Sequence, residues 1–195
     1  MKRKTAVIIG VLLFSSALTG CVGNILTGAT LFYDRHTLYK QAGDFQLGAN
    51  VGRTLYKDTT FKCDHCAIDY AVFNGDILLA GHVPNRALKQ EAERRVKQLS
   101  GYRRLFVQIS LEQAPRDTLE DSWITAKIRS GILADSDINP KKFKVITSDQ
   151  IVYLMGDVLP EQARKVILIA RETSGVRRVV KLFKYFHLSD QPDQN

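Results

Sequence analysis

The hydrophobic positions of this chain recur at two spacings, one typical of strands and one typical of helices. Two short apolar runs, 68–73 and 77–80, flank an Asn-Gly-Asp sequence. Asn-Gly favours a tight hairpin turn, because both residues tolerate positive φ. Apolar residues then recur at helical spacing over 88–99, and a last apolar run covers 105–111. This order predicts strand, strand, helix and strand.

The same order occurs a second time further along the chain. Gly81 and Gly156 follow matching apolar runs at an offset of 75 residues. Gly101 and Gly175 precede matching arginine pairs, in SGYRR and SGVRR, at an offset of 74 residues. The turn of the second hairpin, Ser-Asp-Gln, is a weaker turn sequence than Asn-Gly-Asp. We therefore expect two copies of one small domain.

A stretch with helical periodicity precedes each hairpin, over 44–55 in the first copy and over 121–133 in the second. Asp44 and Asp121 stand at the beginnings of these stretches, and we interpret them as helix starters rather than catalytic acids. The predicted fold is α+β. It consists of two tandem αββαβ domains, each with two helices packed on a three-stranded mixed sheet.

The first twenty residues have the pattern of an export signal. Three basic residues are followed by an uncharged, mostly apolar stretch over 5–17, which is too short for a transmembrane helix of roughly 20 apolar residues. Next comes Leu18-Thr19-Gly20-Cys21, which is typical of a bacterial lipobox with Cys21 as the acylated residue. Valine at position 22 favours sorting to the outer membrane. The alternative is a secretory signal that is cut at another small residue, with Cys21 incidental.

These patterns divide the chain into six segments. They are a lipoprotein signal peptide (1–20), a lipidated N-terminal segment (21–43), the first domain (44–111), a polar linker (112–120), the second domain (121–188) and a tail (189–195).

The chain is basic, with a formal net charge of +8, of which the signal segment holds three cations. Segment 139–186 alone contains ten basic and four acidic residues. An exported basic protein meets anionic lipid head groups or acidic glycans, so we expect these partners and no nucleic acid. The plainer interpretation of the scattered cations is a solvated face.

Cys63 and Cys66 form a Cys-X-X-Cys pair in a chain expected to be exported. The alternatives are a local disulfide, free or partly reduced thiols, and a metal or redox site. A redox pair needs a helix N-terminus, whereas this pair precedes a strand, and a zinc site needs about four ligands. We expect no metal site, no catalytic residues, and no cofactor apart from the covalent lipid on Cys21.

The segments DSWITAKIRS (121–130), VYLMG (152–156) and SGVRRV (174–179) resemble the BON domain family. With YDR at 33–35, the chain resembles more closely the dual-BON outer-membrane lipoproteins of proteobacteria, the DolP type. The resemblance covers nearly all of the mature chain. It implies a non-enzymatic, outer-membrane-anchored protein that faces the periplasm, binds anionic phospholipid through its second domain and supports envelope integrity. The family pattern does not require the Cys63–Cys66 pair.

The helical stretch 121–133 has one apolar stripe of three isoleucines, which should face the sheet. Trp123 and Leu133 lie off this stripe, and Lys127 and Arg129 are also on the outer side. Aromatic residues with neighbouring cations are typical of membrane interfaces. With the resemblance, these four residues are the predicted phospholipid-binding residues. The alternative is that Trp123 covers the edge of the core and Leu133 closes the helix end.

Two other functions stay open at this point. One is a protein-interaction scaffold for outer-membrane assembly or secretion machinery, with the first domain's sheet edge or the cysteine loop as the contact. The other is a periplasmic metal or thiol-redox protein that uses Cys63 and Cys66.

Overall fold

The structure is a computed structural model that describes residues 30–113 and 117–186, with side chains from residue 40 onward. The expected signal peptide, the lipobox residues Leu18, Thr19 and Gly20, the lipidation site Cys21 and the tail 189–195 lie outside the described residues. The chain divides into two compact units, Met1–Leu38 and Tyr39–Asn195. All packing reported below lies within the second unit.

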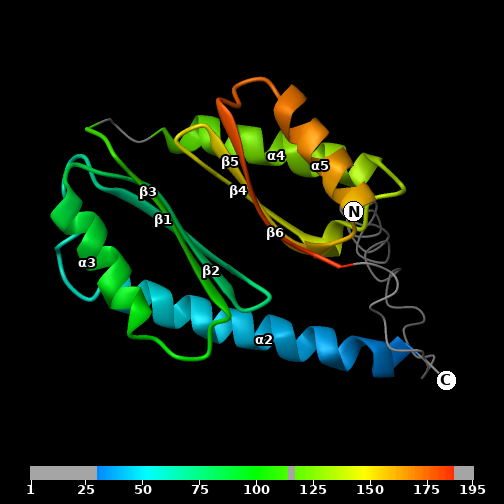
Figure 1. The fold of residues 1–195 in the computed structure, drawn as a ribbon, viewed down its shortest axis with the longest axis horizontal. Helices are drawn as coiled ribbons and strands as arrows, with labels where there is room; N and C mark the ends of the chain where they lie inside the picture. The colour runs from blue at the N-terminus through cyan, green and yellow to red at the C-terminus, as the bar shows by residue number, and fades with distance from the viewer. Residues whose placement is uncertain (1–29, 114–116, 187–195) are drawn as a thin grey trace, which may run out of the picture. The chain divides into compact units, whose positions relative to one another are not determined.

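The first domain has a three-stranded sheet in the order β1-β2-β3 (Figure 1). The hairpin strands β1 (Ala67–Phe73) and β2 (Asp76–Val83) are antiparallel, and β3 (Arg104–Leu111) is parallel to β2. Helix α3 (Arg86–Lys97) makes the crossover between the two parallel strands, as a parallel pair requires. The second half of α2 (Thr30–Leu55) packs with α3 on the same face of this sheet.

The second domain repeats this topology, with strand order β4-β5-β6. Its hairpin is β4 (Phe143–Ser148) and β5 (Ile151–Val158), and β6 (Arg178–Tyr185) is parallel to β5. Helices α4 (Thr118–Ala134) and α5 (Pro160–Glu172) cover the outer face of the sheet, and a short turn, η2 (Pro140–Lys142), precedes β4. The predicted fold class, two tandem αββαβ domains, is confirmed.

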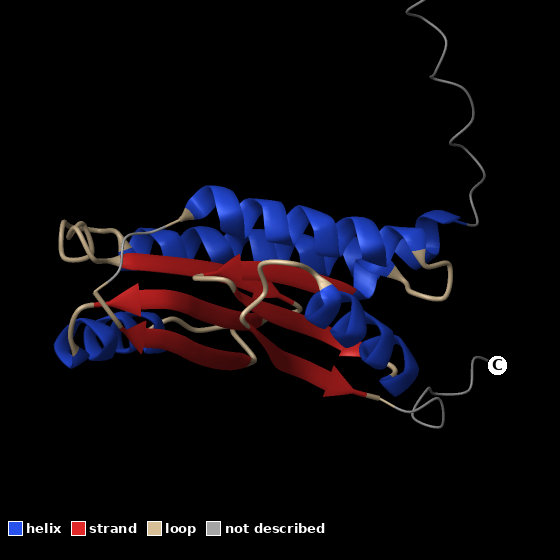
Figure 2. Cartoon of the chain, turned by 90° about the horizontal axis from the view of Figure 1, so that it is seen from above, coloured by secondary structure: helices blue, strands red, loops and turns tan. Residues whose placement is uncertain are grey.

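The inner faces of the two sheets pack on each other. A shared apolar cluster joins Ala71, Leu78 and Ala80 of the first domain to Tyr153, Met155 and Leu182 of the second. In Figure 2 the strands run side by side, with helices at the edges of the view. The central strand β2 is buried along its whole length, because helices cover one of its faces and the second domain covers the other.

Asp44 and Asp121 are not the helix starters that the sequence suggested. Asp44 lies well inside α2, and α4 begins at Thr118 with Asp117 as its N-cap. Each carboxylate instead accepts two backbone N–H groups of the hairpin turn in its own domain. Asp44 accepts from Asn74 and Gly75 at 2.7 and 2.8 Å. Asp121 accepts from the equivalent turn of the second domain at 2.9 and 2.8 Å.

Burial raises the pKa of Asp121, although the two backbone bonds act in the opposite direction. The Asp121 carboxylate therefore binds the 149–150 turn although partial burial disfavours its charged form. The two aspartates have the same tertiary role in the two domains: each fixes a hairpin to the helix that precedes it.

Gly81 in β2 occupies a position that requires glycine, both for its backbone conformation and for lack of space. Its φ is +104°, a conformation that side chains rarely adopt. A Cβ at this position would also collide with the carbonyl oxygen of Ala67 on β1. Gly156 is its counterpart in β5, where a Cβ would collide with the carbonyl oxygen of Lys142. The repeated glycines thus mark close contacts between backbones.

Candidate functional site

Helix α4 presents large apolar side chains to solvent along its outer face. Leu119, Trp123 and Leu133 are 83%, 63% and 70% exposed. The three isoleucines of the same helix, 124, 128 and 132, are buried on the opposite face. Isolated exposed apolar residues are common on protein surfaces, but three on one helix face make that face a candidate contact surface. We call this set, Leu119, Trp123 and Leu133, the α4 outer face.

Leu119 was missed by the sequence reasoning, because the helix was expected to begin at Asp121. The structure extends α4 by three residues at this end, to Thr118. The side chain of Asp117 accepts the backbone N–H of Glu120 at 3.0 Å, as an N-cap does. An acidic cap followed three residues later by glutamate is a recognisable start signal in the sequence. Reading it would have placed Leu119 on the outer side.

Lys127 and Arg129, the two predicted cations, lie on different sides of this face. The Nζ of Lys127 is 5.2 Å from the centre of the Trp123 ring, within the range of a cation–π contact. Arg129 instead donates a hydrogen bond to the carbonyl oxygen of Val145 on β4, at 3.2 Å. Lys127 therefore holds its charge beside the tryptophan, and Arg129 lies at the flank of α4 next to the sheet.

Two grooves run along this flank of α4. One, of about 370 Å³, has Arg129, Leu133, Phe143 and Lys144 in its walls, so it combines apolar surface with two cations. The other, of about 410 Å³, is lined mainly by polar side chains of α4, β4 and β1. Arg129 borders both grooves. Arg129 thus lies on α4 between a mainly apolar groove and a mainly polar groove.

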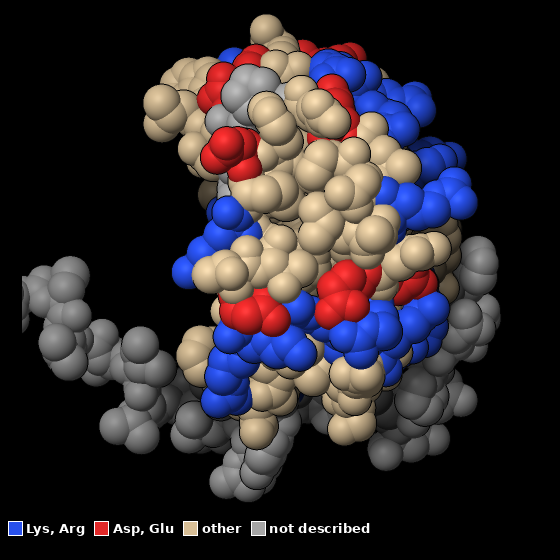
Figure 3. Space-filling model, turned by 90° about the vertical axis from the view of Figure 1, so that its left-hand side faces the viewer, with Lys and Arg blue, Asp and Glu red and all other residues tan. Residues whose placement is uncertain are grey.

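Some cations of α5 and α3 are paired with acids. Lys165 of α5 forms ion pairs with Asp135 at 3.2 Å and Asp137 at 2.6 Å. In the first domain, α3 pairs Arg94 with Glu91 at 2.7 Å. The lower part of Figure 3 shows basic and acidic side chains next to one another, in keeping with such pairs. The scattered cations of these helices are therefore not a single free basic patch.

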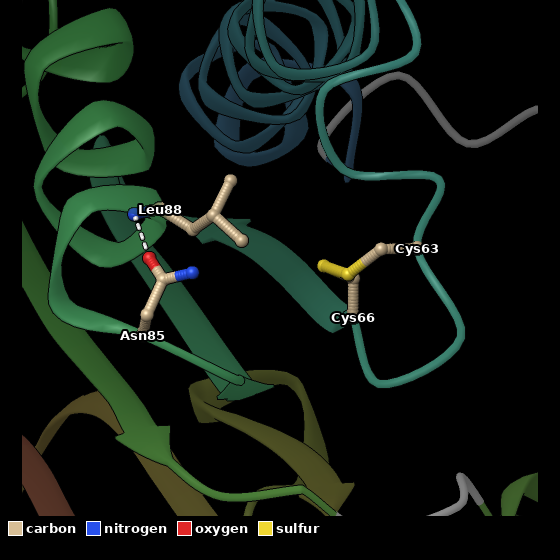
Figure 4. The surroundings of a disulfide bond; sticks show 4 residues. All are labelled: Cys63, Cys66, Asn85 and Leu88. Carbon is tan, nitrogen blue, oxygen red and sulfur yellow. Dashed lines mark hydrogen bonds between the residues drawn. A yellow bond between two sulfur atoms is a disulfide. The ribbon is translucent and has the colours of Figure 1, made fainter.

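Cys63 and Cys66 are joined by a disulfide in the loop between α2 and β1 (Figure 4). The backbone N–H of Cys66 also donates to the carbonyl oxygen of Cys63 at 3.0 Å, so the pair closes a tight turn. This turn leads into a strand, and it lacks the helix N-terminus that lowers a thiol pKa in redox pairs. Within the described ranges, no group of His, Cys, Asp and Glu is arranged to hold a metal ion.

The loop before the disulfide is fixed by Arg95 of α3. This buried guanidinium donates to the carbonyl oxygen of Leu55 at 2.8 Å, to Asp58 at 2.9 Å and to Glu91 at 2.7 Å. Hydrogen bonds from Arg95 keep the pKa of Asp58 well below its ordinary value. The loop that leads to the Cys63–Cys66 turn is therefore tied to α3.

Two αββαβ units in tandem define an α+β protein of the BON type. The sequence pattern of the BON domain matches residues 44–113 and 120–185. The chain belongs to the BON domain family. Among the residues that the structure describes, none of the helices has the length and apolarity to cross a bilayer.

Named relatives match along most of the chain. It is 30% identical over 191 residues to the outer membrane lipoprotein DolP of Haemophilus influenzae, covering 94% of this chain and 96% of that protein. It is 31% identical over 147 residues to the 21 kDa hemolysin of Actinobacillus pleuropneumoniae, covering 74% and 75% of the two chains.

Among solved structures, one that matches this chain is the C-terminal domain of CdsD, a structural protein of the type III secretion system of Chlamydia trachomatis. It is 12% identical, with a TM-score of 0.29, and the match covers 71% of this chain and 96% of that one. A likeness at this level supports no inference about function.

Proposed function

We propose that this protein is a lipoprotein of the outer membrane that faces the periplasm, binds anionic phospholipid through α4 and supports envelope integrity. The observation that carries the proposal is the α4 outer face, three large exposed apolar side chains with Lys127 beside Trp123. Support for the anchor comes from the lipobox and from the match to DolP along nearly the whole chain. The protein acts as a binding protein rather than an enzyme.

The chemistry of the α4 outer face suits the boundary between head groups and acyl chains. Burying a leucine side chain contributes about 1.5–3 kcal/mol, and tryptophan is at home where its ring is apolar and its N–H is hydrated. A cation beside an anionic leaflet contributes about 1 kcal/mol. Part of each gain is lost because the helix meets an interface rather than a dry core. The expected affinity is therefore modest.

A modest affinity is sufficient for a tethered protein. Acyl chains on Cys21 would keep the second domain close to lipid, so the effective lipid concentration is high. One acyl group alone gives marginal binding, whereas several chains hold a protein firmly. In this arrangement α4 sets how the domain meets the membrane, and the acyl chains supply most of the attachment.

Co-sedimentation with lipid vesicles tests the proposal. The chain from residue 22 onward, which keeps every element described above, is mixed with vesicles of phosphatidylglycerol and phosphatidylcholine, or of phosphatidylcholine alone. We expect binding to the anionic vesicles and a loss of at least tenfold in the Trp123→Ala/Leu133→Asp variant. Leu119→Asp should weaken binding in the same direction.

The matched control is Leu168→Asp on α5, a leucine that is 55% exposed outside the α4 outer face. It carries the same change of charge and should bind within about twofold of the parent chain, a difference under 0.5 kcal/mol. Equal binding by the parent chain and the Trp123/Leu133 variant would exclude α4 as the contact. Absence of binding by the parent chain would exclude the lipid function and favour a scaffold role.

A further inference from the structure

The interface between the two domains is built from the same positions twice. His82 in β2 and Asp157 in β5 each follow the glycine that approaches the neighbouring strand. Asn74 and Asp149 each occupy the first turn position with positive φ in their hairpins. The strand residue of each domain reaches the turn residue of the other. The two contacts are therefore related by an approximate twofold exchange of the domains.

The chemistry of the two contacts differs. On one side, Asn74 Nδ2 donates to Asp157 Oδ2 at 3.3 Å. On the other side, His82 Nδ1 lies 2.9 Å from Asp149 Oδ2 and 3.0 Å from Oδ1. The side chain of His82 is only 1% exposed. The histidine contact is thus the shorter and more deeply buried of the pair.

Asp149 is connected directly to the proposed lipid-binding helix. Its backbone N–H, and that of Gln150, donate to the two carboxylate oxygens of Asp121. The side chain of Gln150 also donates to Glu120. Glu120 and Asp121 lie in the first turn of α4, three and two residues before the exposed Trp123. His82 of the first domain is therefore two contacts away from the N-terminal end of the α4 outer face.

The 149–150 turn, which links His82 to α4, has a less favourable backbone conformation than the 74–75 turn of the first domain. In the first domain Asn74 and Gly75 adopt φ values of 50° and 77°, which this pair of residues tolerates well. In the second domain Asp149 and Gln150 adopt 55° and 61° without a glycine. A turn without glycine at these angles depends on outside bonds to keep its conformation. Asp121 supplies two of these bonds and His82 supplies one.

We propose that His82 is a positioning residue for α4: through Asp149, the first domain holds the N-terminal end of the lipid-binding helix in place. The helix end is bound to the 149–150 turn by the Asp121 and Glu120 side chains. This turn has a buried partner, His82, in the other domain. Asp69 of β1 also reaches this region, accepting from Ser148 Oγ at 2.6 Å. The inference rests on the proposed function for the role of α4, but its structural part can be measured without lipid.

Because the two interdomain contacts are equivalent, one of them suggests substitutions that break the other and then restore it. His82→Asp places two carboxylates against each other and removes the contact. His82→Asp/Asp149→Asn exchanges the pair for the aspartate–asparagine pair already present between Asp157 and Asn74. On the other side Arg103 also binds Asp157, at 2.8 Å, and Arg177 is its counterpart in the repeated sequence. The double variant should therefore restore the contact that the single one breaks.

Hydrogen exchange of the chain from residue 22 onward is the first measurement, made without lipid. We expect His82→Asp to speed exchange of the amides at 121–124 at least tenfold, and the double variant to return within about threefold of the parent. The control at the equivalent contact is Asn74→Asp, which sets a second carboxylate against Asp157, beside the guanidinium of Arg103. It disturbs the same interface, and it should leave exchange at 121–124 unchanged.

The same four proteins are then compared on phosphatidylglycerol-containing vesicles. We expect weaker binding, by about fivefold, for His82→Asp alone. His82→Leu, which removes the bond without adding charge, gives the same direction of change if His82→Asp does not fold. The inference would be overturned if exchange at 121–124 were unchanged in His82→Asp and His82→Leu. It would also be overturned if Asn74→Asp sped that exchange equally, or if the double variant did not restore it. Rescued exchange with no vesicle binding by any protein would support the positioning role and overturn only the lipid function.

Discussion

Gly131 on α4 lies directly against Ile169 on α5, and a Cβ at Gly131 would come within 2.7 Å of Ile169 Cγ2. The two helices are in close contact at a position where one of them has no side chain. A side chain at this position would push α4 away from α5, so the glycine permits the close packing of the two helices.

Gly131→Ala should lower the free energy of unfolding by up to about 2 kcal/mol. Alanine is better than glycine in a helix by about 1 kcal/mol, but forcing a methyl group into a filled contact costs about 1–3 kcal/mol. In an Ile169→Leu background, which lacks the Cγ2 methyl, the same substitution should become neutral or stabilising. Urea unfolding of the four proteins checks this. A loss of stability that is equal in both backgrounds would rule out the Ile169 contact as its cause.

Lys127→Gln should weaken binding to anionic vesicles about fivefold at low salt. A cation beside an anionic leaflet contributes about 1 kcal/mol, and salt reduces the contribution. Lys165→Gln is the control, because Lys165 is already paired with Asp135 and Asp137. Co-sedimentation at two salt concentrations measures both variants. If the two substitutions weaken binding equally, a general charge effect explains the result and Lys127 has no local role.

Much of the fold follows from local signals in the sequence. The Asn74-Gly75 turn, the helical spacing over 88–99 and the repeated glycines predicted both domains and their order of elements. The core face of α4 was also predictable, since its isoleucines recur at helical spacing. Such signals act between residues that are close in the chain.

The misses concern contacts between residues that are far apart in the chain. Asp44 and Asp121 suggested helix starts, but their partners are turns about 30 residues away. His82 finds Asp149 at a separation of 67 residues. No periodicity encodes such partners. The unbroken apolar run 77–80, which we interpreted only as a strand of the hairpin, is typical of a strand buried on both faces, as β2 is.

Replacing both Cys63 and Cys66 with serine should lower the free energy of unfolding by about 2 kcal/mol, the chain-entropy value for a loop of about four residues. The Arg95 bonds to Leu55 and Asp58 should keep the preceding loop in place. Lipid binding should therefore be unchanged. Urea unfolding with and without reductant, on the parent and the double variant, tests this. Reduction that alters vesicle binding would instead indicate a functional role for the thiols.

Arg95→Met should raise the pKa of Asp58 toward its ordinary value of 3.8, because the Arg95 hydrogen bonds are the main cause of its lowering. A lowered carboxyl pKa stabilises the fold above pH 3.8, and this contribution is lost as the pH falls further. The variant should be less stable at neutral pH and lose less stability on acidification below pH 4. Carboxyl NMR titration and urea unfolding at several pH values measure these effects. An unmoved Asp58 titration would contradict the assignment.

The apolar cluster shared by the two sheets has a consequence for how the protein folds. Leu78 of one domain and Tyr153 of the other are buried against a surface that neither domain possesses alone. A domain expressed without its neighbour would expose this sheet face to water and would tend to aggregate. The intact chain should accordingly unfold in a single cooperative transition, with calorimetric and van't Hoff enthalpies in agreement, although its sequence is that of two domains.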